Sequence, residues 1–143
     1  MDERIVILGA GSAGIGVANS LVSYMVIKCG LSEEEAVKRF WLVDDKGLLT
    51  KARGPQPDGS EGRVRLFPGQ DAFLRDGIEL EGASLMSVIK HVKPTILLGL
   101  SGVGGLFTPE VCQEMGKHNE RPVIFAMSNP SSQAECTAET AFR

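Results

Sequence analysis

The sequence lacks any apolar run near the roughly 18 residues that a helix needs to cross a membrane. It also lacks an excess of positive charge, since 15 lysines and arginines stand against 18 aspartates and glutamates in 143 residues. Without a broad positive field, a surface has little attraction for nucleic-acid phosphates. Residues 1–4 have neither the basic region nor the apolar core of a secretory signal. We therefore expect a soluble cytoplasmic protein that binds neither membranes nor nucleic acid, or an organelle-matrix protein if a transit peptide precedes this sequence.

Cysteine and histidine, the usual ligands of zinc, are few and scattered. Cys29, Cys112 and Cys136 form no C-x-x-C pair, no histidine lies at ligand spacing from them, and an odd number argues against a complete disulfide framework. We expect reduced thiols and no metal site. His91 and His118 each follow a helical pattern, where the helix C-terminus suits a partial positive charge, so we expect both to be solvated.

The hydrophobic content of 43% in 143 residues is enough for one core, which favours a single domain over residues 1–143. Short runs that are apolar throughout are typical of strands buried on both faces of a parallel sheet. Four such runs occur, at residues 4–8, 40–43, 95–100 and 123–127. Helical patterns alternate with them, so the sequence predicts an α/β, Rossmann-like doubly wound parallel sheet. Because that fold normally has six strands, about four indicate an incomplete sheet with both ends cut.

The expected helices carry recognisable start signals. Ser32 with Glu35 forms a capping box, and Thr108 precedes Pro109 at a helix start. A helix is also expected from Ser12 to about Gly30, and another over residues 83–92.

A G-x-G-x-x-G motif joins the first expected strand to the first helix. Gly9 allows the tight turn, Gly11 allows backbone to approach a pyrophosphate, and Gly14 lets the helix pack closely on the strand. Amides at the helix start, including those of Ser12 and Ala13, offer donors to the phosphates. A purely structural turn is the alternative, but the strand before the motif and the helix after it favour dinucleotide binding.

Asp44 ends the second expected strand, where a carboxylate accepts hydrogen bonds from the adenosine ribose. Its alternative role is that of a solvated turn residue ahead of Gly47. Asp45 adds a second negative charge, and two carboxylates repel a 2′-phosphate, which favours NAD over NADP. NADP stays an alternative, because a basic side chain that folds back onto the 2′-phosphate would offset this repulsion. The candidates are Lys46, Lys51, Arg53, Arg63 and Arg65.

Two further loops follow expected strands. Ser101 and Gly102 come after the third strand, and Asn129 comes after the fourth. Ligands of open α/β sheets bind outside the carboxyl ends of the strands, so both loops are expected to face the cofactor. Ordinary turns are the alternative.

Longer stretches of the chain resemble malic enzymes. The similar segments are Ile7 to Gly16, Phe40 to Asp44 with Lys46-Gly47-Leu48, Lys93 to Thr108, and Ser128 to Glu139. They occur in order along nearly the whole chain, and only residues 53–70 do not align convincingly. This resemblance is far more specific than the glycine motif.

The resemblance implies oxidative decarboxylation of malate to pyruvate and carbon dioxide, with hydride passing to NAD or NADP. It implies a divalent Mg or Mn ion and a homo-oligomer in the full-length enzyme. By similarity, Gly9, Gly11, Gly14 and Asp44 bind the dinucleotide, and Asn129 reaches both the nicotinamide and malate.

The family's tyrosine and lysine acid/base pair and its metal-binding carboxylates precede the glycine motif, outside this sequence. No converging set of carboxylates replaces them here, so we expect no catalytic residue, no bound metal and no malate turnover by this chain alone. Two hypotheses remain: a piece of a malic enzyme, which the severed last helix and missing strands favour, or a free-standing dinucleotide-binding module without catalysis.

Overall fold

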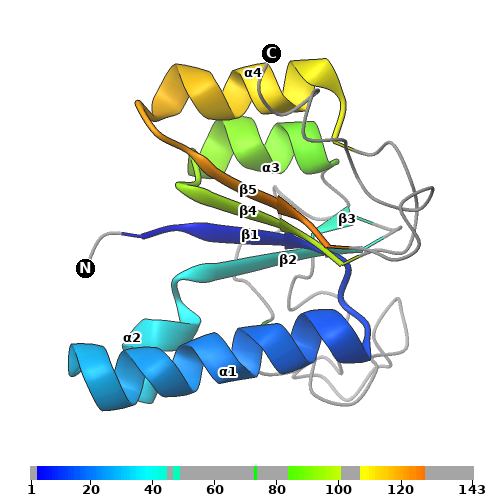
Figure 1. Cartoon of the computed structure of the whole chain (residues 1–143). Helices are drawn as coiled ribbons and strands as arrows, with labels where there is room; N and C mark the ends of the chain where they lie inside the picture. Colours follow the sequence, from blue (N-terminus) through cyan, green and yellow to red (C-terminus); the bar gives the residue numbers. More distant parts are fainter. Residues whose placement is uncertain (1–2, 45–46, 49–72, 74–83, 101–106, 128–143) are drawn as a thin grey trace, which may run out of the picture.

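The computed structural model describes residues 3–44, 47–48, 73, 84–100 and 107–127. Within them, one five-stranded sheet has the order β3-β2-β1-β4-β5 (Figure 1). Four strands are parallel: β1 (Ile5–Leu8), β2 (Phe40–Asp44), β4 (Ile96–Gly99) and β5 (Val123–Ala126). From the central β1 the chain passes to one side into β2 and later to the other side into β4, which is a doubly wound path. The expected α/β fold with a parallel sheet is confirmed.

The described sheet has one strand more than the expected count of about four. The missed strand is β3 (Gly47–Leu48), which turns back from β2 and pairs with it antiparallel, Leu48 opposite Val43 and Gly47 opposite Asp44. Two residues are too short to show a period in the sequence. Gly47 has a φ of 99°, a backbone conformation that glycine adopts readily and other residues rarely do.

In the described part of the chain, four helices flank the sheet, namely α1 (Ser12–Cys29), α2 (Glu33–Val37), α3 (Leu85–Val92) and α4 (Pro109–His118). The predicted capping box is present, with Glu35 N donating to Ser32 Oγ at 3.2 Å and Ser32 N to Glu35 Oε2 at 3.0 Å. Thr108 caps α4 by accepting from Val111 N at 3.3 Å. Helix α3 begins two residues later than predicted, because Ser84 is its N-cap.

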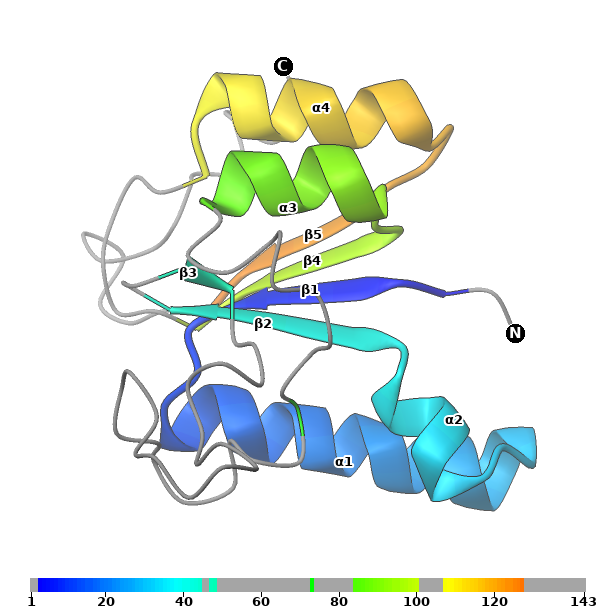
Figure 2. The same cartoon turned by 180° about the vertical axis from the view of Figure 1, so that it is seen from behind.

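The helices form two layers. α1 and α2 cover one face of the sheet and α3 and α4 cover the other, as two opposite views show (Figures 1 and 2). The alternation of β1 divides the core accordingly: Ile5 and Ile7 pack in the cluster with α1, whereas Val6 and Leu8 pack in the cluster with α3 and α4. All four residues are buried, as a central parallel strand requires.

Edge strand β5 is covered on one face only by the described residues. Its Ile124 and Ala126 pack against the α3 and α4 cluster. On the α1 side, Val123 is 38% exposed, Phe125 54% and Met127 41%. Among the described helices, none combines the length and apolarity of a membrane span.

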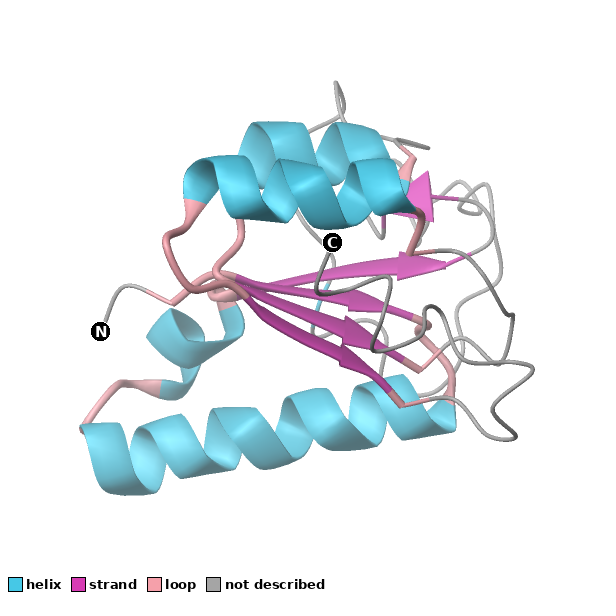
Figure 3. Cartoon of the chain, turned by 45° about the horizontal axis from the view of Figure 1, so that its top comes forward, coloured by secondary structure: helices cyan, strands magenta, loops and turns pink. Residues whose placement is uncertain are grey.

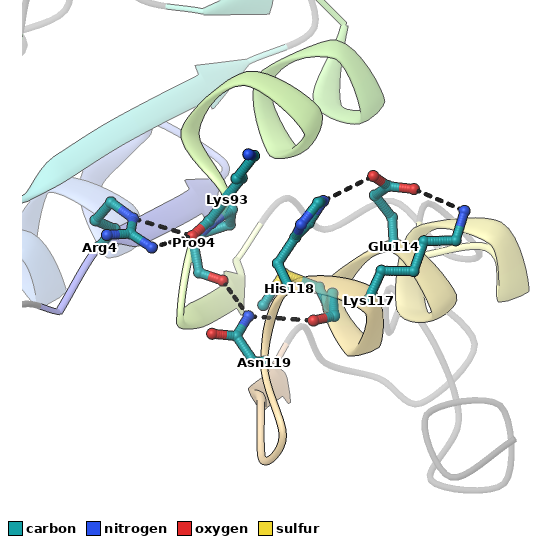
Figure 4. A network of polar contacts seen from close by, with 8 residues as sticks. Arg4, Lys93, Pro94, Glu114, Lys117, His118 and Asn119 are labelled. Carbon is teal, nitrogen blue, oxygen red and sulfur yellow. Dashed lines mark hydrogen bonds and ion pairs between the residues drawn. The ribbon is translucent and has the colours of Figure 1, made fainter.

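Hydrogen bonds connect the segments at the amino-terminal ends of the strands (Figure 4). Arg4 donates twice to the carbonyl oxygen of Lys93, from Nε at 3.0 Å and from Nη2 at 2.8 Å. Asn119 Nδ2 donates to the carbonyl oxygens of Pro94 at 2.7 Å and Met115 at 3.1 Å. The connection between α3 and β4 is therefore held from both β1 and the end of α4.

The prediction of two solvated histidines was wrong for His118. Its Nε2 lies 2.8 Å from Glu114 Oε1, and its side chain is only 22% exposed, because the spacing of four residues on α4 brings the two side chains together. His91 is exposed, as expected. Cys29 is an exposed thiol and Cys112 a buried one, while Cys136 lies outside the described residues.

Candidate functional site

The turn between β1 and α1 depends on the backbone conformation and backbone hydrogen bond of Gly9. Gly9 has a φ of 112°, a conformation that L side chains rarely adopt. Its N–H donates to the carbonyl oxygen of Val43 at 2.7 Å, which ties the turn to β2. Gly11 is then the N-cap residue of α1, and Gly11, Ser12 and Ala13 are exposed. The arrowheads of the parallel strands all point to the side of the sheet where α1 begins (Figure 3).

Gly14 is required by packing inside the protein. A Cβ added to it would lie 1.9 Å from the carbonyl oxygen of Gly9 and 2.9 Å from its carbonyl carbon. Both are backbone atoms of the turn, so neither can swing aside as a side chain would. The helix thus approaches the turn at a distance that only glycine permits.

Gly11 differs from Gly14 in this respect. Its φ of −82° is open to any residue, and an added Cβ would meet no described atom within 4 Å. Neither backbone conformation nor packing among the described residues therefore requires glycine here. Because Gly11 has no side chain, the space beside the start of α1 stays open.

The start of α1 also differs from the other described helix starts in having no side-chain cap. Ser32, Ser84 and Thr108 each cap their helix through a side-chain oxygen, whereas Gly11 has no side chain to do so. The first turn of α1 contains no acidic residue, while that of α2 contains three glutamates. Among the described residues, the positive end of this 18-residue helix has no side-chain cap and no acidic residue in its first turn, which suits a bound anion.

Asp44 lies beside this turn. Leu8 pairs with Val43, so Asp44 is one residue beyond the register of β1, level with Gly9. The hairpin with Gly47 fixes its backbone, and its side chain is half-buried. The sequence interpretation overlooked this contribution of the hairpin. The available signal was the spacing of Asp44 and Gly47, because the two residues between them are the length of a common hairpin loop.

Four of the predicted site residues, Asp45, Ser101, Gly102 and Asn129, lie outside the described residues. The chain that leads to them is described. Leu100 N donates to the carbonyl oxygen of Leu8 at 2.8 Å, and Met127 N to that of Gly99 at 2.9 Å. The backbone therefore leaves β4 and β5 at the same edge of the sheet as Gly9.

The described part of the chain offers no cluster of metal ligands. No group of three or more histidine, cysteine, aspartate or glutamate side chains is arranged there to hold an ion. Tyr24, the one tyrosine of the sequence, is 58% exposed in the second half of α1, away from the turn. The described geometry thus suits anion and ribose binding and supplies no metal-dependent chemistry.

Comparison with known proteins gives a consistent match. Residues 1–143 match the family described as malic enzyme, NAD binding domain. The chain is 46% identical to the NADP-dependent malic enzyme of Dictyostelium discoideum over 142 residues, which cover 99% of this chain and 24% of that protein. It is 45% identical to NAD-dependent malic enzyme 2, mitochondrial, of Arabidopsis thaliana over 145 residues, covering all of this chain and 22% of the relative. It therefore spans about a quarter of the length of these relatives.

Proposed function

The chain belongs to the NAD-binding domain family of malic enzymes, and from this membership we propose that it binds a dinucleotide at the turn between β1 and α1. The observation that carries the proposal is the start of α1: it has no side-chain cap and no acidic residue, and it has open space at Gly11. A pyrophosphate there would accept from the amides of the first turn, including those of Ser12 and Ala13. The residues present therefore fit the cofactor.

Asp44 would orient the adenosine half of the cofactor. Its place level with Gly9 supports hydrogen bonds from its carboxylate to the ribose hydroxyls. We propose NAD as the preferred cofactor, because Asp45 next to Asp44 would repel a 2′-phosphate. The relatives include enzymes named for each cofactor, so the family alone does not decide this preference.

The nicotinamide half would lie toward the loops that follow β4 and β5. Ser101 and Gly102 would approach it by backbone, and Asn129 would contact both the nicotinamide and malate, donating from its amide nitrogen and accepting at its oxygen. The exit of both strands at the edge of the glycine turn supports this placement. When bound, the cofactor supplies the hydride acceptor for oxidation of malate.

Decarboxylation needs more than this chain offers. A cation must polarise the developing enolate, and an acid and a base must be within hydrogen-bond reach. The described residues do not fit a metal, so no metal-dependent step is assigned to them. We propose that the chain alone does not oxidise malate and that a complete, homo-oligomeric malic enzyme supplies the Mg or Mn site and the acid/base pair. Malate-dependent reduction of NAD or NADP by the isolated chain with Mn would overturn this part.

Calorimetric titration of the chain tests the proposal directly. NAD is expected to bind, and NADP to bind more weakly. Gly11→Val should reduce NAD affinity at least about tenfold, or about 1.4 kcal/mol, by blocking the approach to the pyrophosphate. Gly116→Val is the matched control, because Gly116 is an exposed α4 glycine whose Cβ would also meet nothing within 4 Å. Equal NAD affinity in all three proteins would refute the site.

The free-standing binding module remains the second candidate function. It shares the cofactor site but predicts no gain of malate oxidation in any longer chain. Joining this sequence to the remaining segments of a malic enzyme relative would separate the two functions. Recovered turnover favours the enzyme part, whereas dinucleotide binding without turnover favours the module.

A further inference from the structure

We draw no further inference here: the strongest candidate, the apolar strip that Val123, Phe125 and Met127 leave exposed on the α1 side of edge strand β5, carries nothing because no described residue shows what covers it.

Discussion

The two ends of the sheet are built in opposite ways. At the amino end, side chains satisfy backbone groups across long sequence separations, as Arg4 does for Lys93 and Asn119 for Pro94. At the carboxyl end, the turn before α1 contains glycines, and no side chain caps the first turn of that helix. Side-chain hydrogen bonds to backbone groups are thus present at the amino edge, while the carboxyl edge keeps backbone donors and space available. Substitutions at the two edges should therefore have separable effects on stability and on binding.

The largest effect is expected from Gly14→Ala. Because its Cβ would lie 1.9 Å from a backbone oxygen of Gly9, the turn or the helix must shift, which should lower the free energy of unfolding by about 3 kcal/mol. Urea denaturation measures the change. Gly16→Ala is the control on the same helix: its Cβ meets nothing within 4 Å, so it should raise the free energy of unfolding by about 0.5–1 kcal/mol. Equal stability of the two variants would show that Gly14 does not limit packing.

A smaller loss is expected from Arg4→Ala at the amino end. It removes both hydrogen bonds to the Lys93 carbonyl and should lower the free energy of unfolding by about 1–2 kcal/mol. NAD affinity, measured well below the unfolding transition, should stay unchanged. Arg121→Ala, at an exposed arginine with no hydrogen bond or ion pair recorded in the described part, should be close to neutral. If folded Arg4→Ala lost NAD affinity, the amino edge would also affect binding, and the two edges would not have separable roles.

The smallest expected effect depends on pH. The hydrogen bond from His118, and secondly that from Lys117, lowers the pKa of the Glu114 carboxyl below its ordinary value of 4.5, although burial opposes this. A lowered folded-state pKa gives a stabilising contribution that is present above pH 4.5 and is lost as pH falls through the folded-state pKa.

Glu114→Gln should remove that contribution. The difference in unfolding free energy between wild type and variant should be steady just above pH 4.5 and shrink at lower pH, as urea titrations at several pH values would record. The exposed Glu120 provides the control variant Glu120→Gln, which should show a smaller change. A difference that grows as pH falls would contradict the assigned direction.

Local signals in the sequence were sufficient for much of the fold. Continuous apolar runs located the four parallel strands, and Ser32 and Thr108 located two helix starts, because each signal lies within a few residues. The two-residue β3 has no such period. The contacts of Arg4 with Lys93 join residues 89 positions apart, so no local pattern could reveal them.

The candidate site was predictable to a similar extent. The G-x-G-x-x-G spacing identified the turn, and the structure adds that Gly14 is needed for packing whereas Gly11 is not. The sequence could not separate these two roles, since both depend on distances between β1 and α1. The binding roles of all the predicted site residues remain predictions, and Asp45, Ser101, Gly102 and Asn129 lie outside the described residues.

The central claim is that the carboxyl edge alone receives the dinucleotide, and backbone amide NMR during NAD titration tests it most directly. The account predicts that the amide signals of Gly11 to Ile15 and of Asp44 shift with increasing NAD, while those of Arg4, Thr95 and Asn119 do not. Shifts confined to the amino edge, or no shift in the first turn of α1 at saturating NAD, would contradict it.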